Sequence, residues 1–209
     1  MTHTLLVFHG FTMNGELMRA ALSPLATALE PKVRLLCLDA PHTCSAETVE
    51  RVYRGSSAAR LSPPHLCWWN ASDDGLDYRG WQDTRDQVSA ALARYAPASI
   101  LGFSQGGTLA AAVAALSRRG ELPPVHAAVL IAGRKPRAAS LQAAFIEPVA
   151  VPSLHVWGER DILTRQHSEE LVECFSAAQR EVARWPGGHV LPTSGPAYEA
   201  IVRFVAEHA

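Results

Sequence analysis

Residues 99–116, SILGFSQGGTLAAAVAAL, decide the fold class of this chain. The run Ser99–Phe103 predicts a strand, and the Ala- and Leu-rich run that begins at Thr108 predicts a helix. Between them lies Gly102-Phe103-Ser104-Gln105-Gly106, a G-x-S-x-G pattern. A serine on a sharp turn between strand and helix is typical of a nucleophile elbow, in which flanking glycines relieve crowding and the hydroxyl stands exposed above the sheet. We therefore expect Ser104 to be a catalytic nucleophile.

On both sides of this element, short β-branched or Leu-rich runs alternate with helical patterns, which is typical of an α/β fold. The expected strands are Thr4–His9, Val33–Leu38, Ser99–Phe103, Ala127–Ile131, Ser153–Trp157 and Glu181–Trp185. The expected helices are Gly15–Leu29, kinked or shortened by Pro24, Trp81–Tyr95, Gln105–Arg119, Arg165–Ala177 and Pro196–Glu207. The pattern predicts a mainly parallel sheet of about six strands with helices on both faces. The 209 residues contain no repeat or linker, so we expect a single domain over residues 1–209.

The segment Ala40–Gly80 departs from this alternation. It contains three prolines, a Gly-Ser-Ser stretch and the apolar cluster Leu66-Cys67-Trp68-Trp69. A connection this long inside a compact domain is usually functional. We interpret residues 40–80 as a lid or pocket wall. The alternative is a surface excursion that its tryptophans pin to the core.

A serine hydroxyl needs a base to accept its proton at neutral pH. Among nine histidines, His189 is the strongest candidate. It lies in the glycine-rich loop Pro186-Gly-Gly-His189-Val-Leu-Pro192, between the last expected strand and the last expected helix. His9 is expected instead to brace the loop after the first strand.

The base needs an acceptor at its second ring nitrogen, which fixes its tautomer and orientation. Asp161, in the turn after the strand Ser153–Trp157, is the expected acid, with Glu159 as the alternative. The chain order Ser104, Asp161, His189 is the order found in α/β-hydrolases.

An oxyanion hole at this site would combine two backbone N–H groups. We expect one from Gln105 and one from Phe11, with Thr12 as the alternative to Phe11. Apolar residues near the same loops are candidates for an acyl pocket, and with Thr12 they are Met13, Trp68, Trp69, Leu163 and Leu191. No arginine cluster in the sequence indicates a phosphate or carboxylate substrate.

Five segments, HGFTMNGE, WWNASDD with a following Tyr, ILGFSQGG, PSLHVWGERD and PGGHVLP, together resemble the FSH family of serine hydrolases. The resemblance runs from about Leu5 to Pro192 and is loose around Arg54–Pro64. It implies a compact α/β-hydrolase fold, carboxylesterase-type activity and a triad on Ser104, Asp161 and His189. Acyl-protein thioesterases and carboxylesterases share the GFSQGG elbow and remain a related alternative.

Composition excludes other classes of protein. With 19 Lys+Arg against 20 Asp+Glu, the chain has no basic excess for nucleic acid. Its first residues carry no charged leader, and its longest apolar run, Leu109–Leu116, is shorter than a membrane span, so we expect a cytoplasmic protein. The oligomeric state is not readable from the sequence. One zinc alternative is His42, Cys44, His65 and Cys67, although His-x-Cys is not a common zinc spacing and we expect loop and core residues there.

These observations predict hydrolysis of a carboxylic ester, or a thioester, of a short-to-medium acyl chain through an acyl-enzyme on Ser104. The partner is a small-molecule ester, and the chemistry requires no metal or organic cofactor. One alternative is an acyl-protein thioesterase or lysophospholipase-like hydrolase. Another is a hydrolase-fold protein that binds a ligand without turnover, although the sequence has lost no triad member or loop glycine.

Overall fold

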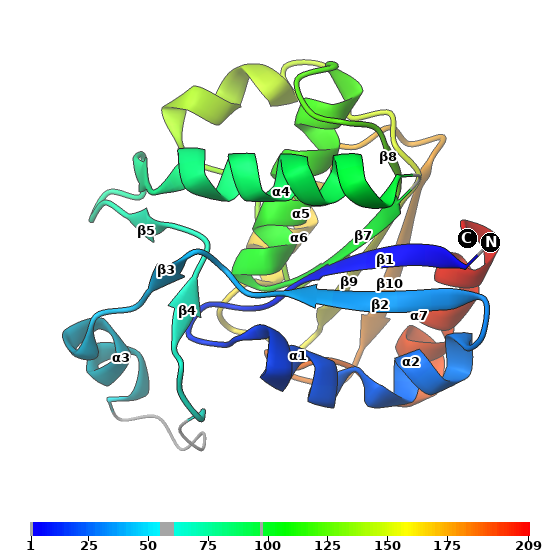
Figure 1. Cartoon of the computed structure of the whole chain (residues 1–209), viewed down its shortest axis with the longest axis horizontal. Coiled ribbons are helices and arrows are strands. Elements are labelled where there is room, and N and C mark those ends of the chain that lie inside the picture. The colour runs from blue at the N-terminus through cyan, green and yellow to red at the C-terminus, as the bar shows by residue number, and fades with distance from the viewer. Residues whose placement is uncertain (1, 55–60, 97) are drawn as a thin grey trace.

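A six-stranded parallel sheet forms the centre of the protein (Figure 1). The computed structural model describes residues 2–54, 61–96 and 98–209. The strand order is β10-β9-β8-β7-β1-β2, and every neighbouring pair is parallel. The bounds are β1 His3–Phe8, β2 Val33–Leu38, β7 Ala98–Phe103, β8 Val125–Ile131, β9 Ser153–Gly158 and β10 Arg180–Trp185. The predicted parallel sheet of about six strands is confirmed.

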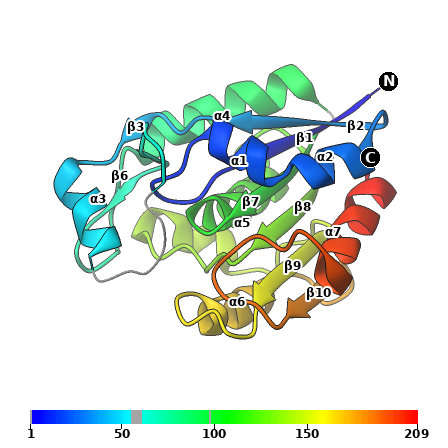
Figure 2. The same cartoon turned by 90° about the horizontal axis from the view of Figure 1, so that it is seen from below.

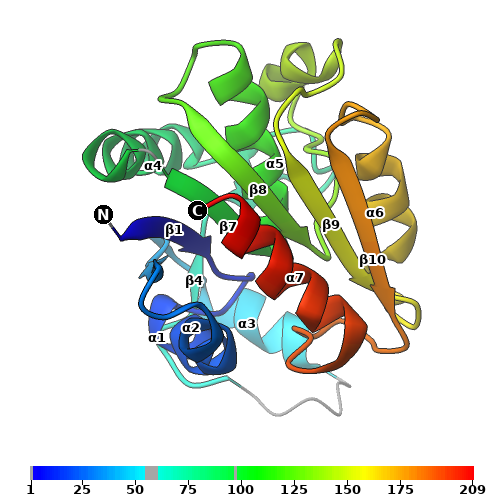
Figure 3. The ribbon, with the colours of Figure 1, turned by 90° about the vertical axis from the view of Figure 1, so that its right-hand side faces the viewer.

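Helices cover both faces of this sheet (Figures 1 and 3). One face packs against α4 (Trp81–Tyr95), α5 (Gln105–Arg118) and α6 (Arg165–Val172), with the 3-10 helix η1 (Ala139–Phe145) beside α5. The other face packs against α1 (Gly15–Ala21), α2 (Ser23–Leu29) and α7 (Gly195–Glu207). Because side chains of a strand alternate between faces, Leu6 and Phe8 of β1 join the first core and Leu5 and Val7 the second. The α/β class with two covered faces is therefore confirmed.

Two predicted helices differ from the observed ones by more than one residue. The expected helix Gly15–Leu29 is two helices, which meet at Leu22, and Pro24 lies in the first turn of α2. A proline is tolerated there because a first-turn N–H has no partner within the helix. Helix α6 ends at Val172, and the N–H groups of Cys174 and Phe175 donate to carbonyls three residues back. These tightened bonds end the helix before Ala177.

The segment 40–80 forms short elements of its own beyond the carboxyl ends of β1 and β2 (Figures 1 and 2). These elements are β3 (His42–Thr43), α3 (Ala46–Tyr53), β4 (Leu66–Cys67), β5 (Asn70–Ala71) and β6 (Tyr78–Arg79). Strand β3 pairs with β4 and β5 with β6, both antiparallel. Residues 55–60, which include the Gly-Ser-Ser stretch, lie outside the described residues. No helix in the described ranges is long and apolar enough to cross a membrane.

His155 is a titratable group inside the core of this fold. It lies on β9, is 1% exposed, and packs edge-to-face on Phe175 with ring centroids 4.7 Å apart. Burial, reinforced by the charge of Arg180, lowers the pKa of His155 to about 3. The unfolded chain binds a proton at this side chain near pH 6.5, whereas the folded chain does not until far lower pH. Above pH 6.5, His155 therefore does not lower the free energy of unfolding. As the pH falls from 6.5 toward 3, His155 lowers the free energy of unfolding progressively.

We expect His155→Gln to weaken the acid sensitivity of the fold. Between pH 7 and pH 5 this histidine should account for about 2 kcal/mol of lost stability, which the variant should not lose. Urea unfolding at the two pH values measures the difference, and His167→Gln, at an exposed position of α6, is the matched control. An unchanged pH dependence in His155→Gln would show that the buried imidazole is not the cause.

Candidate active site

Ser104 lies on a strained turn between β7 and α5. Its φ of 56° and ψ of −114° fall outside the regions that a non-glycine residue ordinarily adopts. The Ser104 N–H donates to the Ile131 carbonyl at the end of β8, 2.9 Å away. A Cβ at Gly102 would collide with the backbone of Gly106, and a Cβ at Gly106 would collide with the backbone of Phe8. Both glycines are thus required by the close approach of α5 to the ends of β7 and β1.

The structure brings the three predicted triad residues together. Ser104 Oγ lies 2.9 Å from His189 Nε2, and His189 Nδ1 lies 2.7 Å from Asp161 Oδ2. His189 comes from the loop after β10 and Asp161 from the turn after β9. Their side chains are 22% and 0% exposed, respectively. The hydroxyl, imidazole and carboxylate therefore form one continuous chain of hydrogen bonds that begins in solvent and ends in the interior.

Asp161 is held by three further donors, all from the two residues directly before α6. The N–H groups of Leu163 and Thr164 donate to Oδ1 at 2.9 and 3.0 Å, and Thr164 Oγ1 donates to Oδ2 at 2.6 Å. Burial by itself would raise the pKa of Asp161, but the hydrogen bonds from Thr164 and His189 outweigh burial and lower the pKa. The carboxylate is therefore anionic at neutral pH. The alternative acid, Glu159, is exposed, and no hydrogen bond or ion pair joins it to His189.

Two backbone N–H groups at this cavity have no acceptor in the described part of the chain. They belong to Phe11, after β1, and Gln105, the first residue of α5; both residues line the cavity that contains Ser104. The amide of Thr12 instead donates to the Leu66 carbonyl at 2.9 Å. This bond removes Thr12 from consideration as an oxyanion donor. Beneath the loop, His9 Nδ1 bonds the Gly10 carbonyl and Nε2 accepts from the Ala40 N–H, so His9 braces the loop as expected.

The side chain of Gln105 ties the elbow to the segment 40–80. Its Oε1 accepts from the Trp68 N–H at 3.0 Å, and its Nε2 donates to the Trp69 carbonyl at 2.9 Å. Trp68 is fully buried against Phe8 and His9, and its indole N–H donates to the His9 carbonyl. Trp68 thus supports the catalytic loops from inside the core.

A cavity of about 850 Å³ opens beside Ser104. Of the six residues predicted to form an acyl pocket, only Trp69 lines it. Thr12 and Trp68 are buried beneath the surface, Met13 and Leu191 pack toward the core around α1, α2 and α7, and Leu163 is 59% exposed outside the cavity. The prediction of an apolar pocket built by these residues is therefore wrong for this cavity.

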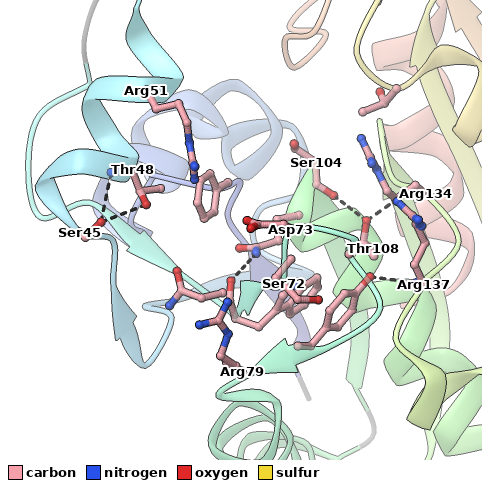
Figure 4. A pocket seen from close by; sticks show the side chains of 18 of the residues that line it. Ser45, Thr48, Arg51, Ser72, Asp73, Arg79, Ser104, Thr108, Arg134 and Arg137 are labelled. Atoms are coloured by element: carbon pink, nitrogen blue, oxygen red, sulfur yellow. Dashed lines mark hydrogen bonds between the residues drawn. The ribbon is translucent and has the colours of Figure 1, made fainter.

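Four arginines line the cavity instead: Arg51, Arg79, Arg134 and Arg137 (Figure 4). No arginine cluster in the sequence indicated an anionic substrate, and the structure brings these four together. The four residues are spread over more than 80 positions of sequence, and only folding brings them to one hollow.

The zinc alternative does not form in the described residues, where no three His, Cys, Asp or Glu side chains converge as metal ligands. His42 is paired opposite Cys67 across β3 and β4, but its Nε2 bonds the Gly80 carbonyl at 2.9 Å and lies 3.6 Å from Asp83.

Comparison with known proteins identifies the family. A family model described as "Serine hydrolase (FSH1)" matches residues 1–201. The chain belongs to this family. Among its relatives, Esterase OVCA2 of Danio rerio is 31% identical over 207 residues, which cover 91% of this chain and 90% of that protein. Esterase OVCA2 of Homo sapiens is 30% identical over 217 residues, or 96% and 94% of the two chains.

Solved structures share the fold of this FSH1-family serine hydrolase. Zea mays acyl-protein thioesterase 2 superimposes with a TM-score of 0.72 at 18% identity, covering 99% of this chain and 94% of that one. Esterase PE8 superimposes with a TM-score of 0.71 at 18% identity, covering 100% and 93%. The expected α/β-hydrolase fold is confirmed.

Sequence reasoning missed two side chains that hold the site of this serine hydrolase together. Thr164 carried a signal, because Asp161-Ile-Leu-Thr164 before a helical pattern is typical of a capping turn. The side chain of Gln105 carried none, because its partners lie 36 and 37 positions earlier in the chain.

We expect Gln105→Met to destabilise the protein, because the Trp68 N–H and the Trp69 carbonyl lose their partners. The loss in free energy of unfolding should be about 1–2 kcal/mol. Gln82→Met, which removes an exposed hydrogen bond to Asp86 on α4, should cost less than about 0.5 kcal/mol. Urea unfolding measures the free energy of unfolding of both variants. Equal losses of stability would mean that the hydrogen bonds of Gln105 contribute no more than an exposed hydrogen bond does.

Proposed function

We propose that this chain hydrolyses carboxylic esters through an acyl-enzyme on Ser104, with His189 as general base and acid and Asp161 as the residue that orients it. One observation carries the proposal. The Ser104 hydroxyl, held on a strained turn, lies 2.9 Å from an imidazole whose other nitrogen lies 2.7 Å from a buried carboxylate. Membership of the serine hydrolase (FSH1) family and the relatives named esterases support it.

In the acylation half of the reaction, Ser104 Oγ attacks the ester carbonyl carbon, and its proton passes to His189 Nε2. The bond from the carbonyl carbon to the leaving oxygen then breaks, and the alcohol departs with the proton from His189. Asp161 stabilises the imidazolium formed between these steps; its lowered pKa keeps it anionic throughout.

In the deacylation half, water attacks the acyl-enzyme and gives its proton to His189 Nε2. The bond to Ser104 Oγ breaks, Oγ recovers the proton from His189, and the carboxylic acid leaves. The free N–H groups of Phe11 and Gln105 would bind the carbonyl oxygen as it becomes an oxyanion in both halves. The N-terminal end of α5, which lies directly after Ser104, favours the same negative charge.

We propose that residues 40–80 form one wall of the pocket. They belong to the same domain as the rest of the chain. The segment supplies more than half of the lining of the cavity, from Thr43 on β3 to Arg79 on β6. Gln105 and the buried Trp68 fix it against the elbow. Trp69, stacked on Tyr78 with ring centroids 4.5 Å apart, is the part of this wall against which an acyl chain would pack.

We expect Ser104→Ala and His189→Ala each to lower kcat on a p-nitrophenyl ester by at least about 1000-fold, because either change removes the proton transfer that activates the nucleophile. Asp161→Asn should lose activity as well, although less, since nucleophile and base remain. Steady-state kinetics measures these losses, with circular dichroism to verify folding.

Glu159→Gln is the matched control for the acid, because Glu159 is exposed two residues before Asp161. It should keep wild-type kcat. Loss of activity in Glu159→Gln together with near-full activity in Asp161→Asn would overturn the assignment of the acid.

A further inference from the structure

The cavity beside Ser104 has a strong excess of positive charge. Four guanidinium groups line it, whereas Asp73 is the only carboxylate among the described residues that do so. The protein as a whole has a formal net charge of −1. The positive charge is therefore concentrated in this cavity and does not reflect the charge of the protein as a whole.

Backbone hydrogen bonds hold two of these arginines in place, and those of Arg134 lead to the backbone of Ser104. The Arg134 N–H donates to Thr108 Oγ1 at 3.2 Å, and Thr108 Oγ1 donates to the Ser104 carbonyl at 3.3 Å. The Arg137 N–H donates to the buried Tyr78 hydroxyl at 2.9 Å. Figure 4 shows the Arg134 and Arg137 side chains on the same side of Ser104.

The other two arginines come from the segment 40–80. Arg51 projects from α3 and Arg79 from β6, and Figure 4 shows them across the cavity from Arg134 and Arg137. Positive charge thus faces the hollow from both walls, and a ligand bound near Ser104 lies between them.

None of the four guanidinium groups forms an ion pair with a carboxylate in the described part of the chain. On the outer surface, by contrast, Arg85, Arg119, Arg165, Arg180 and Arg203 each lie within 4 Å of a glutamate. Asp74, next to the cavity, accepts hydrogen bonds from Ser72 Oγ and the Leu76 N–H. These two bonds are the main causes of its lowered pKa, ahead of the charge of Arg137. The cavity arginines are therefore not neutralised by an ion pair with the described residues, and the one hydrogen bond that the Arg134 guanidinium donates to them, to the Leu163 carbonyl at 3.5 Å, leaves its other donors for an added anion.

A second cavity, of about 550 Å³, is also lined by positively charged side chains. Arg134 and Arg137 line it as well as the first cavity, Lys135 adds a third positive charge, and Glu170 opposes them. The two arginines therefore stand between two hollows, and a ligand that extends from Ser104 into the second one must pass them.

We propose that the ester cleaved at Ser104 carries a second, anionic group, a carboxylate or a phosphate, which binds Arg134 and Arg137. The inference rests on the proposed function of Ser104 and names its substrate class. A planar guanidinium donates two parallel hydrogen bonds to either oxyanion, and such charge-assisted bonds are stronger than neutral ones. Binding of the anion at these residues places the ester carbonyl at Ser104, whereas a neutral ester gains nothing from them.

The experiment uses two pairs of substrates, each matched except for charge. Monoethyl adipate and ethyl hexanoate share the ethyl ester, and only the first carries a carboxylate on its acyl part. Hexanoyl-4′-phosphopantetheine and hexanoyl-pantetheine share the thioester, and only the first carries a phosphate on its leaving group. We expect the wild-type protein to prefer the anionic member of one pair by about tenfold or more in kcat/KM. The pair that shows the preference distinguishes a carboxylate on the acyl part from a phosphate on the leaving group.

Arginine variants test whether these residues cause the preference. In Arg134→Gln and Arg137→Gln the ratio of anionic to neutral kcat/KM should fall toward one, and Arg134→Lys should recover part of it. Arg203→Gln is the matched control, because Arg203 pairs with Glu181 and Glu207 on the outer surface, and it should keep the wild-type ratio. Added salt should shrink the ratio in the wild type, since ions screen partly exposed charges.

A binding measurement on Ser104→Ala separates this inference from the proposed function. Calorimetry with adipate and with pyrophosphate should show one of them binding, and Arg134→Gln in the same background should abolish it. If the wild type hydrolyses both members of each pair equally, or if its preference survives in all arginine variants, the inference is overturned while the esterase function stands. If no ester or thioester is hydrolysed although the anion binds, the proposed function fails instead.

Discussion

The close approach of α5 to the ends of β1 and β7 is the constraint on which the site depends. At Gly102 and Gly106 the backbones lie so near one another that no Cβ fits. This contact forces the chain to turn within one residue, and Ser104 takes up the strained conformation that results. The turn lies where the strand order reverses, between β1 and β7, and open α/β sheets bind ligands at such a point.

Once Ser104 is fixed there, parallel strands deliver the remaining groups to the same edge of the sheet. Asp161 follows β9 and His189 follows β10, so the carboxyl ends of two neighbouring strands place the carboxylate and the imidazole side by side. The two residues directly before α6 then supply three hydrogen bonds to Asp161, which keep it anionic in spite of its burial. On the other side, Gln105 binds the backbone of Trp68 and Trp69 and holds the segment 40–80 against the elbow.

The sheet and the three central residues were predictable from the sequence, because each depends on a short local pattern. Gly102 to Gly106 lies between a strand and a helix, and Asp161 and His189 lie in turns after strands, so order along the chain implies nearness in space. The cavity was not predictable in this way. Trp68 looked like a pocket residue by composition, but tertiary contacts with Phe8 and His9 bury it. Arg51, Arg79, Arg134 and Arg137 come from three separate segments, and no local pattern links them.

Covalent labelling tests the central claim, that Ser104 is the nucleophile activated by His189, most directly. The protein is incubated with a fluorophosphonate, digested, and mapped by mass spectrometry at a series of times. We expect a single modified peptide, with the adduct on Ser104, and much slower labelling in His189→Ala. An adduct on another residue, or none in a preparation that hydrolyses esters, would contradict this claim.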